Sequence, residues 1–117
     1  MFLEKMDESL RGSNKTLQVY LPQILSARLP SVQATDEERY LPLFATAFRT
    51  VTESAPSMQY AIMALQFTLP KAQIILADAQ ANSPNADTRA ACERAVTLIR
   101  GGETRNDALF QSLMKKP

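Results

Sequence analysis

The sequence predicts an all-α protein, a compact bundle of about five helices around a kinked, doubly apolar central helix. Three observations favour this fold class. Apolar residues recur at three- and four-residue steps along most of the chain, helix start and stop signals divide it into segments, and strand-like alternation occurs once, over residues 16–21. Because no second strand is evident to pair with those residues, we expect a helix there too.

Length and composition indicate one domain. A chain of 117 residues buries a substantial core as a single unit. Its 45% hydrophobic and 21% charged residues are typical of a globular protein rather than a disordered one. We therefore expect one helical domain over residues 1–117.

The first two predicted helices lie near the N-terminus. Residues 2–10 place four apolar side chains on one helical face, and Gly12 interrupts the pattern. Asn14 is a candidate cap for the next helix, which continues to Arg28. Pro22 either kinks that helix or restarts it as a first-turn residue.

A linker and a start signal come next, over residues 29–40. Thr35 and Glu38 have the spacing of a capping box, in which each side chain binds the backbone amide of the other. Pro42 interrupts the pattern early, so the regular helix is expected to begin there. The helix carries one apolar stripe, formed by Tyr40, Phe44, Phe48 and Val51.

Residues 55–80 are apolar on two opposite sides when plotted at about 100° per residue. A wedge of roughly 80° contains the first stripe, namely Met58, Ile62, Leu65, Leu69, Ala72 and Leu76. An opposite wedge of about 60° contains the second, namely Tyr60, Met63, Phe67 and Ile74. A helix of this kind needs neighbours on both sides.

Pro70 lies in the middle of this segment. The three- and four-residue steps of the first stripe continue past it, so we expect one helix kinked at Pro70. Two helices that meet there are the alternative.

The C-terminal third also contains residues typical of helix starts and helix ends. Ser83 or Asn85 is the expected cap of a helix that stops at Gly101 and Gly102, where a glycine can adopt the left-handed conformation. Thr104 and Asp107 have the spacing of another cap. A final amphipathic helix is expected to carry Leu109, Phe110, Leu113 and Met114.

The second stripe is the predicted partner-binding surface. Methionine and aromatic side chains are enriched at protein interfaces, whereas the first stripe is longer and aliphatic and suits the core. The expected contact residues are therefore Tyr60, Met63, Phe67 and Ile74. The alternative is that helices of the same chain cover both faces.

Residue content argues against catalysis. The chain has no histidine, which excludes Ser–His–Asp and Cys–His nucleophilic sites and the usual zinc and di-iron sites. The single cysteine, Cys92, lies mid-helix beside no evident base. We expect no enzyme activity, no catalytic residues, no metal site and no cofactor.

Charge and hydropathy argue against nucleic acid and membranes as binding partners. The net charge is +1 and the basic residues are scattered, so no stripe is suited to nucleic acid. Residues 55–70 carry no charge but are shorter than the roughly 20 residues that a membrane span requires. One cysteine, and an N-terminus without the plan of a signal peptide, favour the cytoplasm.

These observations favour a small non-enzymatic regulator or adaptor. We expect it to bind another protein through an apolar helix face, to occlude that partner's interaction surface, and to form a homodimer. A secretion or assembly chaperone that shields an apolar partner segment is the alternative. A small enzyme or a nucleic-acid-binding module is less favoured.

Overall fold

The computed structural model describes residues 15–114. This part of the chain folds into six α-helices and two short 3-10 helices, and no strand occurs in it. The all-α prediction is confirmed. The elements in order are α2 (Lys15–Arg28), η1 (Leu29–Ser31), η2 (Ala34–Tyr40), α3 (Leu41–Thr50), α4 (Ser54–Ala64), α5 (Leu69–Asn82), α6 (Ala86–Arg100) and α7 (Asn106–Met114).

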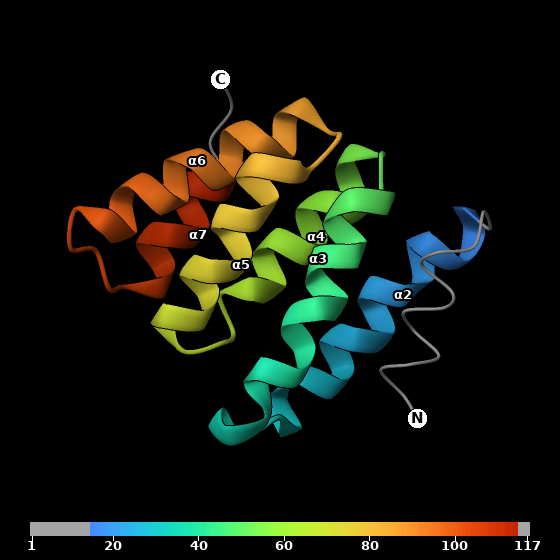
Figure 1. The fold of residues 1–117 in the computed structure, drawn as a ribbon, viewed down its shortest axis with the longest axis horizontal. Helices are drawn as coiled ribbons and strands as arrows, with labels where there is room; N and C mark the ends of the chain where they lie inside the picture. Colours follow the sequence, from blue (N-terminus) through green and yellow to red (C-terminus); the bar gives the residue numbers. More distant parts are fainter. Residues whose placement is uncertain (1–14, 115–117) are drawn as a thin grey trace.

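The helices pack around a single buried cluster. Helix α5 packs on α3, α4 and α6, and α7 packs on α4 and α6. In Figure 1, α2 lies at one end of the molecule and α6 and α7 lie at the other. The buried side chains of the described helices form one continuous core, although the expected domain limits, 1 and 117, fall outside residues 15–114.

An aromatic cluster forms the centre of the core. The Phe44 ring meets the Phe67 ring edge to face at 5.4 Å and the Tyr60 ring at 6.0 Å. Phe48 also contacts Tyr60, at 6.3 Å. The predicted stripe of α3 is confirmed as core, because Tyr40, Phe44, Phe48 and Val51 are all buried.

The expected kinked helix is in fact two helices. Helix α4 ends at Ala64, α5 begins at Leu69, and Pro70 occupies the first turn of α5. Proline suits that position because the first-turn amides have no partner within the helix. The amides of Leu65, Gln66 and Phe67 make tight three-residue backbone bonds that end α4 and turn the chain.

The Glu37 carboxylate holds this turn from outside. It accepts hydrogen bonds from the backbone amide of Thr68 at 3.0 Å and from its hydroxyl at 2.7 Å. Thr68 is the N-cap residue of α5, so a side chain from η2 satisfies the start of a helix far along the chain.

The predicted capping box is therefore wrong. The segment forms η2, whose N-cap is Gln33 rather than Thr35, and no side chain caps it. Glu38 instead pairs with Lys71 of α5, with 2.8 Å between Oε1 and Nζ. The acidic residues here join η2 to α5, a contact that short-range spacing does not reveal.

The other boundary signals behave largely as expected. Asn85 caps α6 by accepting from the Thr88 amide at 2.9 Å, and Gly102 adopts the left-handed conformation with φ 100°. Helix α3 starts at Leu41, next to the expected Pro42. The amphipathic segment predicted over residues 2–10 lies outside the described residues, as does Asn14. No described helix is long and apolar enough to cross a membrane.

Candidate functional site: two grooves beside α4

Most of the predicted partner-binding residues lie in the interior. Tyr60, Met63 and Phe67 retain 0%, 4% and 7% of their surface. The rings of Tyr60 and Phe67 pack on Phe44 of α3, whereas Met63 lies toward α2. Ile74 keeps 52% of its surface on α5. The structure thus does not bring the four together as one surface, and partner contact through Ile74 stays a prediction.

The opposite side of α4 is the accessible one. Met58 and Ile62, which the first stripe assigned to the core, are only partly buried. They share a helical face with Ala55 and Gln59, both exposed, at positions i, i+3, i+4 and i+7. We call this face the α4 ridge, formed by Ala55, Met58, Gln59 and Ile62.

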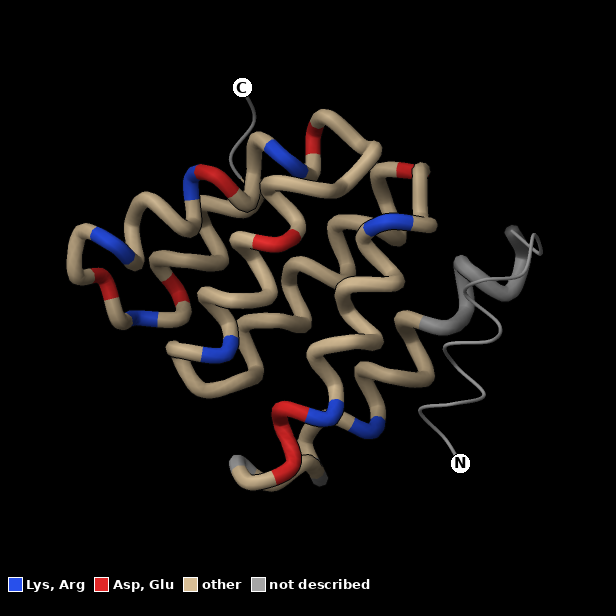
Figure 2. Tube along the Cα trace, viewed as in Figure 1, with Lys and Arg blue, Asp and Glu red and all other residues tan. Residues whose placement is uncertain are grey.

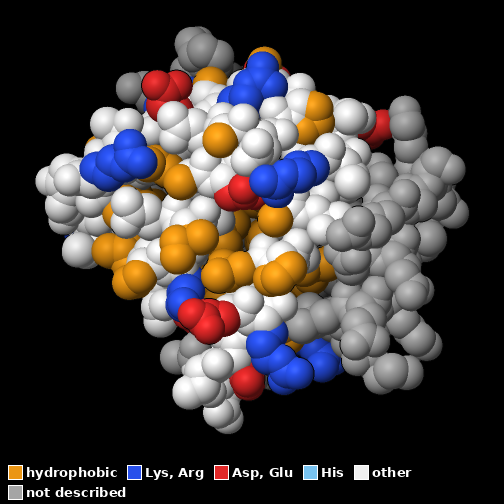
Figure 3. Space-filling view, in the orientation of Figure 1, with side chains coloured by type: hydrophobic (Ala, Val, Ile, Leu, Met, Phe, Trp, Pro, Cys, Tyr) orange, Lys and Arg blue, Asp and Glu red, His pale blue; other side chains and the backbone are white. Residues whose placement is uncertain are grey.

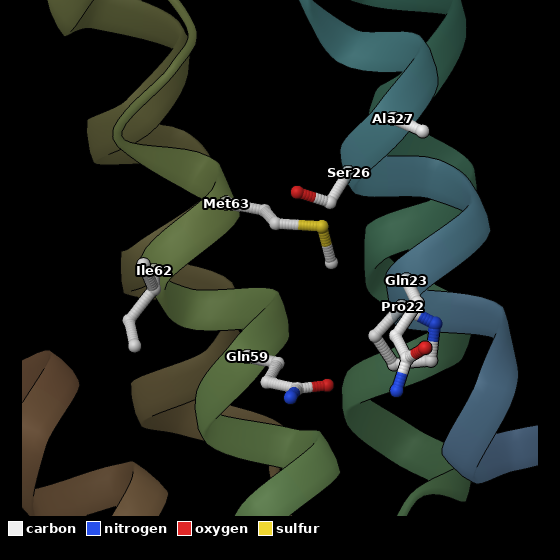
Figure 4. Close-up of a pocket in the computed structure, with 7 residues that line it drawn as sticks. All are labelled: Pro22, Gln23, Ser26, Ala27, Gln59, Ile62 and Met63. Atoms are coloured by element: carbon white, nitrogen blue, oxygen red, sulfur yellow. The ribbon is translucent and has the colours of Figure 1, made fainter.

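The α2–α4 groove follows one flank of the ridge. It has a volume of about 460 Å³ and is lined by Pro22, Gln23, Ser26 and Ala27 of α2 and by Gln59, Ile62 and Met63 of α4. In Figure 4 the Met63 side chain reaches across the gap toward Ser26, whereas Ile62 lies on the other flank of α4. Met63 is thus a wall of this groove, although little of it is exposed.

The α4–α6 groove follows the other flank. It too has a volume of about 460 Å³ and shares Gln59 and Ile62 with the first groove. Small side chains and methionines dominate its lining, with Ser54, Asp87 and Arg94 as the remaining polar groups. The lining residues are Ser54, Ala55, Met58, Gln59, Ile62, Asp87, Ala90, Ala91, Arg94, Leu113 and Met114.

Ile74 borders a smaller hollow between α3 and α5. This hollow has a volume of about 250 Å³, and Leu41, Ala45 and Asp78 are among its lining residues. Figure 3 shows apolar side chains gathered across the middle of this face of the molecule, with charged side chains around them. Asp78, which lines the hollow, accepts two hydrogen bonds from the Arg49 guanidinium, at 2.9 and 3.1 Å.

Charged groups do not gather into a reactive cluster in the described chain. Figure 2 shows acidic and basic residues interspersed, mostly at helix ends and connections. No group of three or more Cys, Asp or Glu among residues 15–114 is arranged to hold a metal ion. Burial raises the pKa of the Cys92 thiol to about 12, despite the opposing effect of Arg94, so this thiol is a poor nucleophile.

The sequence contains a signal for the exposed side of the ridge, which apolar stripes alone do not reveal. Gln59 and Gln66 are exposed, and both flank the first stripe in the helical plot. A polar residue within the i, i+3, i+4, i+7 set of Ala55 and Ile62 marks the face that solvent reaches. The first stripe extends beyond the end of α4. Ala72 and Leu76 on α5 are buried, whereas Met58 and Ile62 on α4 are only partly buried.

Comparison with known proteins adds no assignment. No family model, curated protein or solved structure matches the chain.

Proposed function

We propose that this protein is a non-enzymatic binding protein, an adaptor or chaperone, that holds an apolar helical segment of a partner over the α4 ridge. The observation that carries the proposal is the pair of apolar grooves, about 460 Å³ each, on the two flanks of one helical face. Such a face beside hydrophobic grooves suits helix-in-groove recognition, in which anchors at three- and four-residue spacing enter the grooves.

The lining of the α4–α6 groove suits the apolar side chains of a partner helix better than it suits a reacting substrate. Met58 and Met114 border the α4–α6 groove, and methionine adapts to irregular apolar surfaces. Three alanines, Ala55, Ala90 and Ala91, leave room for a close helix backbone. Occlusion of the partner's apolar face follows directly, because the side chains that enter the grooves are withdrawn from water and from other proteins.

The proposed function is the one predicted from the sequence, but the partner-binding surface is a different one. A regulator or adaptor that occludes a partner segment remains the proposed role, with the chaperone as the close alternative. The contacts move from Tyr60 and Phe67, which are interior, to the ridge and its grooves. The absence of enzyme activity, nucleic-acid binding and membrane contact, and a cytoplasmic location, remain part of the proposal.

A peptide selection tests the site. A display library of helical peptides about four turns long is enriched on the wild-type protein, with apolar residues randomised on one face. We expect enriched peptides to carry apolar anchors at three- and four-residue steps. Ile62→Asp should weaken their binding at least about tenfold, because it places a charge between both grooves.

Two matched variants make the result specific. Leu98→Asp changes an apolar side chain on α6 that is 38% exposed and lines neither groove, so binding should persist. Ile74→Asp tests the α3–α5 hollow in the same way. Circular dichroism confirms that each variant is folded. Peptides that bind Ile62→Asp as tightly as wild type would overturn the proposal, and loss of binding in Ile74→Asp alone would move the site to the hollow.

A further inference from the structure

The α4–α6 groove has a direction, because the N-terminal ends of α4 and α6 meet at one end of it. The Ser54 hydroxyl, in the first turn of α4, donates to Asp87 Oδ2, in the first turn of α6, at 3.2 Å. The next residue of α6, Thr88, donates its hydroxyl to Oγ of Ser57, one turn along α4, at 2.7 Å. The two helices therefore begin together and form the two walls of the groove.

The two ends of the α4–α6 groove also carry opposite charges. Asp87 lines the end where the helices begin, and its side chain is exposed. Arg94 lines the groove seven residues later on α6, about 10 Å along the helix axis. Its Nε donates to the Ser112 carbonyl at 2.9 Å, which holds the stem of this side chain beside α7. One end of the groove thus carries an anionic group and the other a cationic one.

Both features favour the same orientation of a bound helix. The N-terminal ends of α4 and α6 carry partial positive charge, which attracts the partially negative C-terminal end of a third helix. A lysine or arginine in the last turn of that helix stabilises its own C-terminus. In the antiparallel orientation this side chain would also face Asp87.

We propose that the partner segment in the α4–α6 groove is an amphipathic helix that runs antiparallel to α4 and carries a lysine or arginine in its last turn, opposite Asp87. This inference rests on the proposed function and adds the orientation and charge of the ligand. The apolar face of the partner helix packs on the small side chains of Ala55, Ala90 and Ala91. The basic residue in its last turn pairs with the Asp87 carboxylate.

Two synthetic peptides test the inference. They share one apolar face and have blocked ends, but one carries lysines in the last turn and glutamates in the first, and the other has these charges exchanged. Fluorescence anisotropy gives the dissociation constant of each. We expect the wild-type protein to prefer the peptide with the basic last turn by about threefold to fivefold, the range of an exposed ion pair. The preference should shrink as salt is raised to about 1 M.

Variants at Asp87 connect the preference to this side chain. Asp87→Lys should reverse it, and Asp87→Asn, which keeps an acceptor for Ser54, should abolish it. The matched control is Glu93→Lys, because Glu93 is exposed on α6 but does not line the groove. This control makes the same charge change and should retain the wild-type preference.

The outcomes separate the two proposals. Equal affinity for both peptides, or a preference for the acidic last turn, overturns the inference about orientation and leaves the proposed function standing. A preference that survives in both Asp87 variants also overturns it. Binding of neither peptide counts against the proposed function, and the inference then fails with it.

Discussion

Tyr60 places a hydroxyl group in the core without a hydrogen-bond partner. Its side chain is fully buried between Phe44 and Phe48, and its oxygen makes no hydrogen bond. A buried, unsatisfied hydroxyl costs about 1–3 kcal/mol. Burial also raises the pKa of Tyr60 above its usual range, since the charged form would be poorly solvated.

Tyr60→Phe should therefore raise the free energy of unfolding by about 1 kcal/mol, because it removes the unsatisfied oxygen and keeps the ring. Urea denaturation measures the change. Tyr60→Ala provides the contrast and should lower the free energy of unfolding by about 3–5 kcal/mol, because it empties the centre of the aromatic cluster. A clear loss of stability in the phenylalanine variant would show that the hydroxyl contributes to the native state.

Cys92 should make stability depend on alkaline pH. Burial raises the pKa of its thiol from 9.0 to about 12, so the folded state favours the neutral form. This contribution is complete below about pH 9 and is lost as the pH rises toward 12. Over that window the wild type should lose about 1 kcal/mol per pH unit more than Cys92→Ala. Urea denaturation across this pH range checks the difference, and parallel curves would contradict it.

At the scale of elements, η2 and α5 depend on one another through Glu37. Its buried carboxylate accepts both the amide and the hydroxyl of Thr68, the N-cap residue of α5. Glu37→Gln should lower the free energy of unfolding by about 1–2 kcal/mol, because an amide cannot accept both bonds through two oxygens. Thermal unfolding followed by circular dichroism measures this loss.

The neighbouring residue supplies the matched control. Glu38 is exposed and pairs with Lys71, whose hydrogen bond and charge hold the pKa of Glu38 below its ordinary value. Glu38→Gln should change stability little, because solvent screens an exposed pair. Equal losses in the two variants would mean that the cap on α5 contributes nothing specific.

Helix type and most boundaries were predictable because they depend on short-range signals. The stripe of α3, the Asn85 cap and the left-handed Gly102 follow from residues within one or two turns. The break after Ala64 was not predictable in the same way. It depends on the turn through Phe67 and on a carboxylate about thirty residues earlier, which single-helix periodicity does not contain.

The candidate site was only half predictable for a related reason. Helical plotting identified two apolar faces on α4 but not which face its own chain would cover. Phe44 and Phe48 decide this, because their rings pack on Tyr60, whereas Ile62 on the other face is only partly buried.

At the scale of the whole molecule, the homodimer expected from the sequence stays a prediction, and we propose the α4 ridge as its contact surface. We expect the molar mass to approach twice that of the 13.0 kDa chain as concentration rises. Ile62→Asp should stay at the mass of one chain. Light scattering after size-exclusion chromatography measures both, and a dimer that persists in the variant would place the contact elsewhere.

The same surface would then serve two occupants. A peptide that binds the ridge should dissociate the dimer, because both need the grooves beside Gln59 and Ile62. Mass measurements with and without bound peptide check this competition.

The bend at residues 65–68 gives α4 an independence that one continuous rod would not have. Tyr60, on its inner side, packs on the aromatic rings of α3, whereas its outer side borders the two grooves. Substitutions at the exposed Ala55 and Gln59 should therefore disturb the interior less than substitutions at Met58 and Ile62, which pack partly against the core. The outer side of α4 can thus change its surface chemistry at these two positions while the aromatic core of the protein stays the same.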